Sequence, residues 1–432
     1  MYRFSWCCIL MALVGLSSLS FATAQERDKT ANWPPKAFPI TFWCGPPDPY
    51  ITLEQYRAIA DAGFNVVMPP CEGAATVERN RKILDLAVKT GMKAVISDAR
   101  MPLALTNNPT GKQTIADIVA DYRKSTSLMG YFLTDEPGAN SFGDLAEVVA
   151  ELHRLDPNRM VFINLFPNYA STDLTANPSQ LNSLTYAAYL SRYMEVVKPD
   201  VLSWDHYHFL KDGDRPGFFG NLAAGQRAAR ATLPPTPFWQ IVLSVQHGPY
   251  RALTENELRF EAMQTLVYGG RGLAYFTYWQ PNDPSFQWSH TIRNRDGSPG
   301  PLYAPVKAVN ADVKMLGAYL FDAQVEETFQ SGVIAPDGTP ANDDSFVKVS
   351  GECNLTVGTF RGTKGYIYVL VTNRDYTTAA KGQLTLNTVK HPVEQLDLKT
   401  GKWRSWAGKP VNDSVSGEVV LGPAGAALLR WQ

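Results

Sequence analysis

The feature that most constrains the fold of this chain is a repeated alternation of short apolar stretches with amphipathic helical stretches, which starts at Phe38. Such alternation favours a parallel sheet whose strands are joined by crossover helices. Eight strand-helix units within about 240 residues have the size of a (β/α)₈ TIM barrel. The strands are expected at 39–45, 64–69, 93–98, 128–138, 160–166, 201–208, 238–246 and 272–279.

The pattern changes after a last long helix, which is expected at 306–320. Short alternating strands separated by Gly, Asp, Asn and Pro turns are typical of a β-sandwich. Seven are expected, at 346–349, 355–358, 366–371, 382–386, 393–398, 403–406 and 426–431. The predicted fold class is therefore α/β, with a TIM barrel over 38–322 and a small all-β sandwich over 323–432.

The first residues have the form of a secretory signal. Arg3 precedes an apolar stretch from Cys8 to Leu16, and Ala22-Thr-Ala24 forms a cleavage site of the A-x-A type. We expect removal of 1–24, a linker over 25–37, and a secreted or periplasmic protein with no membrane attachment after cleavage.

The mature chain would retain three cysteines, Cys44, Cys71 and Cys353. Cys44 and Cys71 would end neighbouring strands, so a disulfide between them is geometrically possible in an oxidising compartment.

The overall composition argues against a nucleic acid partner. The formal net charge is -1, and no long basic run occurs. Aromatic residues make up 11% of the chain, which suits a protein that stacks sugar rings on aromatic side chains. For any single aromatic residue, packing in the core is the better explanation. We expect an oligo- or polysaccharide as partner and no cofactor.

The fourth expected strand ends in two acids, Asp135 and Glu136, followed by Pro137-Gly138. Pro137 disfavours a helical conformation at Glu136, so the acids lie where the strand leaves the core. Reactive side chains of α/β barrels occupy that end of the strands, which predicts proton-transfer or nucleophilic chemistry here. Neighbouring strand residues point to opposite faces, so only one of the two acids is expected to face the barrel mouth. The alternative is an ordinary polar turn.

Other strand ends carry polar and aromatic side chains that would converge on the same rim and form a pocket. In strand six, Asp205 and Tyr207 share one face, and His206 and His208 share the other. The predicted substrate-binding residues are Trp43, Asp98, Arg100, Asn164, His206, Tyr207, His208, Gln246, Tyr278 and Trp279. A metal site at Asp205, His206 and His208 is a weaker alternative, because barrel metallohydrolases need further ligands and the chain has only 6 His.

Three segments carry a resemblance to a known class of enzymes: Gly130-Tyr-Phe-Leu-Thr-Asp-Glu-Pro137, Trp204-Asp-His-Tyr207 and Gly269-Gly-Arg-Gly-Leu-Ala-Tyr-Phe-Thr-Tyr-Trp279. With them the chain resembles glycoside hydrolases of the clan A barrel type, in particular family 42 β-galactosidase-like proteins. The resemblance implies that Glu136 is the acid/base and that Trp279 floors the subsite around the scissile bond. The sequence departs from that class in having Asp135 where Asn is usual, and in lacking a nucleophilic Glu in Leu243-Ser-Val-Gln-His247, at the end of strand seven.

The missing nucleophile leaves Asp205 as the best second carboxylate. Retaining glycosidases hold two carboxyls about 5–5.5 Å apart and inverting ones about 6.5–9.5 Å apart. Strands four and six are not neighbours, so we expect the wider separation. The resulting hypothesis is an exported glycoside hydrolase with Glu136 as general acid and Asp205 as base or substrate-binding acid, with Asp135 and Asp98 as further candidates. The competing hypotheses are a non-catalytic glycan-binding barrel and a metal-dependent hydrolase.

Overall fold

The computed structural model describes residues 32–432 except 177–179, 388, 390 and 391. The predicted signal peptide and its cleavage site lie outside the described residues. Within the described residues, no helix is both long enough and apolar enough to cross a membrane.

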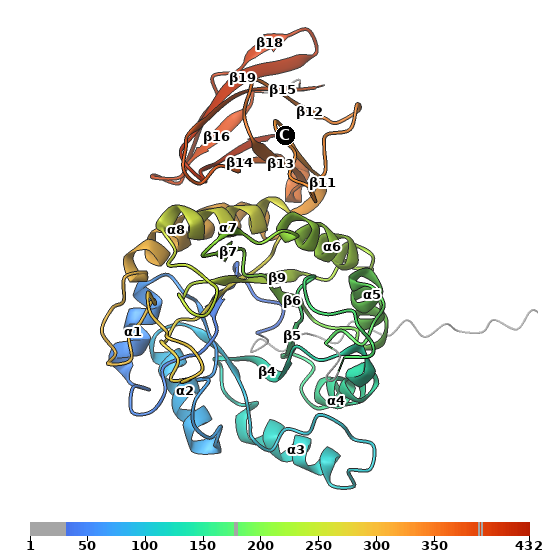
Figure 1. Cartoon of the computed structure of the whole chain (residues 1–432), viewed down its shortest axis with the longest axis vertical. Coiled ribbons are helices and arrows are strands. Elements are labelled where there is room, and N and C mark those ends of the chain that lie inside the picture. Colours follow the sequence, from blue (N-terminus) through green and yellow to red (C-terminus); the bar gives the residue numbers. More distant parts are fainter. Residues whose placement is uncertain (1–31, 177–179, 388, 390–391) are drawn as a thin grey trace, which may run out of the picture.

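Eight parallel strands form the barrel, in the order β1-β10-β9-β6-β5-β4-β3-β2, with helices around them (Figure 1). Backbone hydrogen bonds close the seam between β1 and β2. The backbone N–H of Asn65 donates to the Ile40 carbonyl at 3.1 Å, and that of Gly45 donates to the Pro69 carbonyl at 3.0 Å. The predicted barrel is confirmed. Its strands are β1 (Ile40–Phe42), β2 (Val66–Val67), β3 (Lys93–Ile96), β4 (Leu128–Asp135), β5 (Met160–Leu165), β6 (Leu202–Asp205), β9 (Phe238–Leu243) and β10 (Leu273–Phe276).

Some of the helices begin at residues whose side chains cap them. The Thr52 side chain caps α1, and Thr254 and Glu257 form a capping box at the start of α7. Helix α3 lies between β3 and β4. The helices are α1 (Leu53–Asp61), α2 (Val77–Lys89), α3 (Gly111–Tyr122), α4 (Phe142–Leu155), α5 (Tyr186–Val196), α6 (Phe218–Arg230), α7 (Glu255–Val267) and α8 (Tyr303–Leu320). A short 3₁₀ turn, η1 (Ala139–Ser141), and a hairpin of β7 (Phe209–Leu210) and β8 (Gly213–Asp214) complete these connections. A second 3₁₀ turn, η2 (Thr363–Gly365), lies in the C-terminal part of the chain.

Large aromatic side chains fill the barrel along its axis. Trp33 contacts Trp239 with ring centroids 6.2 Å apart, and Trp239 contacts Phe162 at 5.8 Å. Above them, Trp43 meets Phe132 at 5.4 Å. Trp33 and its neighbours, expected to form a linker, therefore include a ring that packs against the barrel core.

The C-terminal residues form two antiparallel sheets, one with the order β11-β13-β14-β20-β16-β17 and one with the order β12-β15-β19-β18. Apolar residues of both sheets share a second core. The structure thus confirms a β-sandwich, and it adds β11, β18 and β19, which the sequence pattern had not predicted. The strands are β11 (Gln324–Gln330), β12 (Val347–Ser350), β13 (Leu355–Arg361), β14 (Ile367–Asn373), β15 (Ala380–Leu386), β16 (Glu394–Asp397), β17 (Lys402–Ser405), β18 (Lys409–Val411), β19 (Ser414–Leu421) and β20 (Ala426–Trp431).

Helix α7 lies between the barrel and the sandwich (Figure 1). Gln264 of α7 donates to the Thr372 hydroxyl of β14 at 3.1 Å. On the mouth side, the Tyr376 hydroxyl of the sandwich donates to Asp214 of the β7–β8 hairpin at 2.7 Å. The sandwich therefore supports both a barrel helix and a loop at the barrel mouth.

Candidate active site

The end of β4 brings both of its acids to one place. The pairing of β4 with β5 shifts register between Phe132 and Thr134, so Asp135 stands opposite Asn164 rather than one residue away from it. Glu136 then has a φ of 47°, in the left-handed region that non-glycine residues rarely adopt. The strict alternation of side chains between the two faces of the strand is therefore lost over these residues. The expectation that only one acid faces the mouth is therefore wrong, because a bulge and a left-handed residue redirect the side chains.

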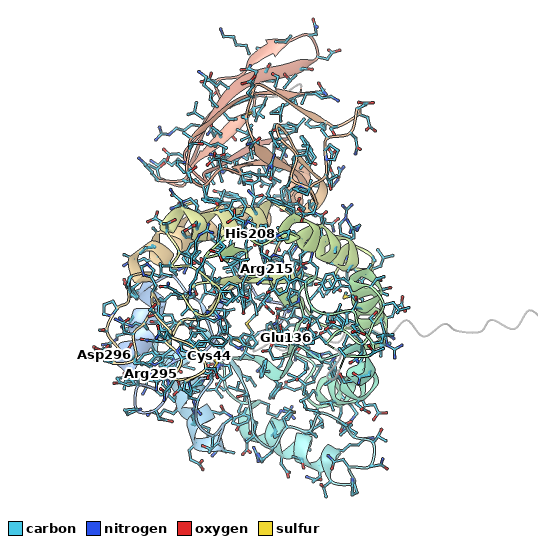
Figure 2. The ribbon with its side chains drawn as sticks, viewed as in Figure 1. Cys44, Glu136, His208, Arg215, Arg295 and Asp296 are labelled. Atoms are coloured by element: carbon cyan, nitrogen blue, oxygen red, sulfur yellow. A yellow bond between two sulfur atoms is a disulfide. The ribbon has the colours of Figure 1, made fainter. Side chains whose placement is uncertain are left out.

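The Asn164 amide joins two of the three carboxyls. Its Nδ2 donates to Asp135 Oδ1 at 3.0 Å and to Asp205 Oδ1 at 2.9 Å, while its Oδ1 accepts a hydrogen bond of 3.1 Å from Ser203. The Glu136 carboxyl is hydrogen-bonded to Asp205. The three predicted catalytic residues therefore form one cluster, and Figure 2 shows Glu136 within the ring of barrel elements.

The cluster keeps protons at neutral pH. Burial, together with the charges of Asp205 and Asp135, raises the pKa of Glu136 to about 9. Burial and the charge of Asp135 raise the pKa of Asp205 to about 7, although the hydrogen bond from Asn164 acts to lower it. Two carboxyls in contact cannot both ionise without repulsion, so the pair holds a proton between them.

Asp135 is the solvent-facing member of the cluster. Its side chain is exposed, whereas Asp205 is only 4% exposed and Glu136 is intermediate. Displacement of water by the surrounding protein still raises the pKa of Asp135, but its exposure weakens this effect.

The predicted separation of Glu136 and Asp205 is wrong. The two carboxyls contact each other directly, which leaves no room between them for the water that an inverting pair requires. Strands β4 and β6 are indeed separated by β5, as expected. The side chains nevertheless meet across β5, because Asn164 is short and sits between them.

Four inward-facing rings at the mouth are only partly buried: Trp43, Phe132, Tyr207 and Phe276. Tyr207 contacts Phe276 with centroids 5.3 Å apart, and Trp43 contacts Phe132. They therefore provide an accessible apolar lining at the mouth, on which the face of a sugar ring could stack.

Arg215 braces the wall next to this lining. Its guanidinium lies 4.1 Å from the centroid of the Tyr169 ring, and it donates to the Tyr207 carbonyl at 3.1 Å and to the Tyr250 hydroxyl at 3.3 Å. Tyr169 is 36% exposed, so this wall reaches solvent.

A second group of rings continues from Phe276 toward the surface. His247 stacks on Trp288 with centroids 4.3 Å apart and an interplanar angle of 17°. It also contacts Phe276 at 5.8 Å and Phe286 at 5.6 Å. Phe286 is 45% exposed, and burial lowers the pKa of His247. We call Phe276, His247, Trp288 and Phe286 the aromatic strip. It is uncharged at neutral pH.

Asp98 and Arg100 take part in a separate network. Arg100 donates to both oxygens of Asp98 at 2.9 Å, and the Tyr122 hydroxyl donates to Asp98 Oδ2 at 2.6 Å. These bonds lower the pKa of Asp98 despite the opposing effect of burial. The structure therefore joins these two predicted substrate-binding residues to α3 rather than to the carboxylate cluster.

The two histidines after β6 face away from Asp205, as the predicted alternation requires. His206 Nδ1 lies 3.2 Å from Asn221 of α6, and burial lowers the pKa of its ring to about 3. His208 stacks on Phe260 of α7, toward the sandwich side (Figure 2). Neither belongs to the carboxylate cluster, and Asp205, His206 and His208 do not converge as metal ligands. The described residues contain no group of three or more His, Cys, Asp or Glu side chains suited to a metal ion.

Tyr278 and Trp279 are buried in the barrel wall, with 0% and 1% exposure. Tyr278 packs on Phe42, and Trp279 packs on Tyr50 with centroids 4.8 Å apart. The expectation that Trp279 floors the central subsite is not met. β10 ends at Phe276, so Phe276 is the ring that its inward face presents there. Gln246 holds a loop, because its backbone N–H donates to the Ser289 carbonyl at 2.9 Å.

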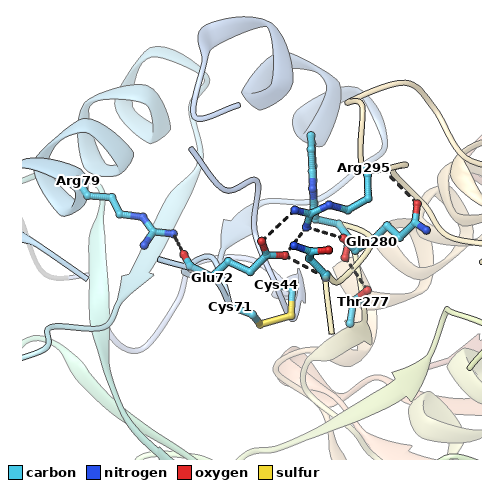
Figure 3. Close-up of a disulfide and its surroundings, with 9 residues drawn as sticks. Cys44, Cys71, Glu72, Arg79, Thr277, Gln280 and Arg295 are labelled. Atoms are coloured by element: carbon cyan, nitrogen blue, oxygen red, sulfur yellow. Dashed lines mark hydrogen bonds and ion pairs between the residues drawn. A yellow bond between two sulfur atoms is a disulfide. The ribbon is translucent and has the colours of Figure 1, made fainter. Parts of the chain in front are cut away.

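Trp279 instead lines a cavity of about 270 Å³ at the rim, beside the disulfide between Cys44 and Cys71. The possible bridge is thus present, and Cys353 is free and buried. Figure 3 shows Glu72 beside the disulfide, in an ion pair with Arg295; the Nη2–Oε2 distance is 3.0 Å. This rim joins the loops after β1, β2 and β10.

The site residues predicted from the sequence do not include Phe132, Tyr169, Arg215, Tyr250, Phe276, Phe286 or Trp288. Phe276 follows the inward parity of β10, which could have identified it. The others lie in loops or depend on the β4 bulge, so strand parity carried no signal for them.

No family model matches this sequence, and no curated protein matches it. Solved structures of glycoside hydrolases share its fold at low identity. A β-galactosidase from Bacillus circulans sp. alkalophilus has a TM-score of 0.60 and 10% identity, over 92% of this chain and 99% of that chain. A family 5 glycoside hydrolase from Bacteroides vulgatus has a TM-score of 0.54 and 12% identity, over 92% of this chain and 89% of that one. A β-galactosidase from Halorubrum lacusprofundi has a TM-score of 0.51 and 12% identity, over 90% of this chain and 99% of that chain. These neighbours belong to more than one glycoside hydrolase family, so they do not single out family 42. What they establish for this chain is the fold.

Proposed function

We propose that this protein is a glycoside hydrolase that uses Glu136 as its general acid. The observation that carries the proposal is the direct contact of the Glu136 and Asp205 carboxyls at the mouth of the barrel, which together with burial raises the pKa of Glu136. A general acid must be protonated at the working pH, and a neighbouring carboxylate is an established means of keeping it so. Asp205 is then the group that maintains the proton on Glu136, and Asp135 is the carboxylate exposed toward substrate.

We further propose a neutral oligo- or polysaccharide as the substrate. Partly exposed rings line the mouth, and the aromatic strip extends this lining without a charged side chain. Export is also part of the proposal. The disulfide between Cys44 and Cys71 is consistent with an oxidising compartment.

Replacement of Glu136 by Gln tests the catalytic role, since the amide keeps the shape of the side chain but cannot donate a proton to a leaving group. Against a panel of aryl glycosides and oligosaccharides, kcat should fall about 10²–10⁴-fold. The loss should be smallest for aryl glycosides whose leaving group needs no protonation. An unchanged kcat on every substrate would contradict the assignment.

A non-catalytic glycan-binding barrel is the second candidate, and the absence of a carboxylate at the end of β9 favours it. Wild type and Glu136→Gln would then bind the same oligosaccharides with equal affinity in calorimetry, and neither would release sugar.

A further inference from the structure

The end of β9, where a nucleophile could face Glu136, carries no carboxylate. The segment after β9, from Ser244 to His247, contains no acid. The carboxyls that act on Glu136 are those of Asp205 and Asp135, and Asp205 is in direct contact with it. A sugar ring cannot lie between two hydrogen-bonded carboxyls, so Asp205 is excluded as a nucleophile in this arrangement.

Asp135 approaches from the same side as Glu136. The Cα atoms of consecutive residues are about 3.8 Å apart, so the two side chains start from almost one point at the end of β4. Asp135 therefore cannot reach the opposite face of the ring while Glu136 protonates the leaving oxygen. Neither of the two acids that act on Glu136 is therefore placed to serve as the nucleophile.

Asp135 is well placed to hold a substrate N–H group. Its Oδ1 accepts the hydrogen bond from Asn164, which fixes the carboxylate. In the part of the chain that the structure describes, no donor is bound to its Oδ2, and the side chain is exposed. A fixed carboxylate with one free oxygen is suited to orient an amide N–H and to stabilise positive charge that develops on it.

The strand that carries Asp135 also contributes to an apolar floor. Phe132 precedes it on β4, and Phe132 and Trp43 are both partly exposed, with ring centroids 5.4 Å apart. Such a floor would receive a methyl group more favourably than a hydroxyl.

We propose that the site cleaves glycosides of 2-acetamido sugars, with the substrate's own acetamido oxygen as nucleophile and Asp135 as the residue that holds the acetamido N–H. This inference rests on the proposed glycosidase function and specifies its substrate class. Some glycosidases are known to use such substrate assistance in place of a protein nucleophile.

In the first step the acetamido oxygen forms a bond to C1 as the bond from C1 to the leaving oxygen breaks. Glu136 gives its proton to that oxygen, and the alcohol departs. The product is a cyclic oxazolinium ion whose N–H is held by the Asp135 carboxylate. In the second step water attacks C1 and gives a proton to Glu136. The bond between C1 and the oxygen of the oxazolinium ring breaks, which restores the acetamido group. Both steps invert C1, so the configuration is retained overall.

The mechanism restricts the substrate further. The acetamido oxygen reaches C1 only from the face opposite the leaving group, so the glycosidic bond must be trans to the acetamido group. In the gluco and galacto series this is the β anomer.

The test compares 4-nitrophenyl β-glycosides of N-acetylglucosamine and N-acetylgalactosamine with those of glucose and galactose, using the mature full-length protein. We expect kcat/KM to be at least about 100-fold higher for the acetamido substrates, because intramolecular attack replaces a bimolecular step. Equal or faster cleavage of the 2-hydroxyl substrates would overturn this inference and leave the glycosidase proposal intact. No cleavage of either class would count against both.

A second comparison isolates the nucleophile. Successive fluorination of the acetyl group weakens its oxygen as a nucleophile, so the trifluoroacetamido substrate should lose about 100-fold or more in kcat. Asp135→Asn should lose about 10²–10³-fold on the acetamido substrate while folding normally. Leu233→Ala, a substitution at a 95% exposed residue outside the site, is the matched control. It should leave kcat unchanged on both the acetamido and the trifluoroacetamido substrate. A rate that does not respond to fluorination would contradict substrate assistance even if Asp135→Asn were inactive.

Discussion

At the scale of single residues, the backbone at the end of β4 decides the chemistry. The φ of 47° at Glu136 is unfavourable for a residue with a Cβ, and it persists because the side chain is held by Asp205 and the β4 bulge precedes it. The result is a carboxyl pair that shares a proton. Neither residue alone would have a pKa far above its ordinary value in an open, singly charged site.

The pH dependence of activity should report this pair. A general acid works while it is protonated, so activity is retained below the pKa of Glu136, about 9, and is lost as the pH rises through that value. Asp205→Asn removes one of the negative charges that raise this pKa. We expect the alkaline limb of the kcat/KM profile to move to lower pH by about one unit. An alkaline limb at the same pH in both proteins would show that Asp205 does not maintain the proton.

At the scale of elements, the loop after β10 carries part of the proposed binding surface. Trp288 is anchored by its Nε1, which donates to the Asp283 carbonyl at 2.9 Å, and the Ser289 amide donates to the Gln246 carbonyl at 3.1 Å. The exposed ring of Phe286 is therefore held on a fixed base. A rigid aromatic surface loses little entropy on binding.

Phe286→Ala should weaken substrates that extend past the scissile bond. We expect KM to rise about three- to tenfold for an oligosaccharide, with little change for the corresponding glycosyl fluoride, whose leaving group is a single atom. Steady-state kinetics on both substrates measures the effect. An equal rise in KM for both would indicate a general disturbance of the mouth instead of a lost stacking contact.

The disulfide ties together the loops after β1 and β2, at the seam of the barrel. It closes a loop with a sequence separation of 27 residues. Replacing both Cys44 and Cys71 by Ala should lower the free energy of unfolding by about 2–4 kcal/mol, measured by denaturant titration. As a control, a reductant should destabilise the wild type and leave the double variant unchanged. Equal stability of the oxidised wild type and the variant would show that the seam is held by the barrel alone.

At the scale of the whole molecule, the sandwich completes the barrel's packing. Helix α7 has ten buried residues, from Glu257 to Val267, because β9 lies on its inner side and β13 and β14 lie on its outer side. This explains why α7 is not amphipathic like a surface helix. The hydrogen bond between Tyr376 and Asp214 links the sandwich to the hairpin that precedes Arg215.

A chain ending at residue 322 should therefore fail to form a stable barrel. Its outer α7 face would be exposed, and such apolar surfaces promote association. We expect aggregation or strong binding of a hydrophobic dye, assessed by size-exclusion chromatography and fluorescence, compared with the full-length protein. A soluble truncated monomer with a sharp thermal transition would contradict this view of the sandwich.

The sequence by itself determined the barrel, the sandwich and the acids at the strand ends, because side-chain periodicity and turn residues reflect burial directly. It also identified the parity that separates Asp205 from His206 and His208. Only the tertiary structure decided that Asp135 and Glu136 lie together, that Asp205 contacts Glu136, and that Phe276 rather than Trp279 faces the mouth. The physical reason is that a bulge and a left-handed residue override a period of two, and contacts between loops depend on the closure of the whole barrel.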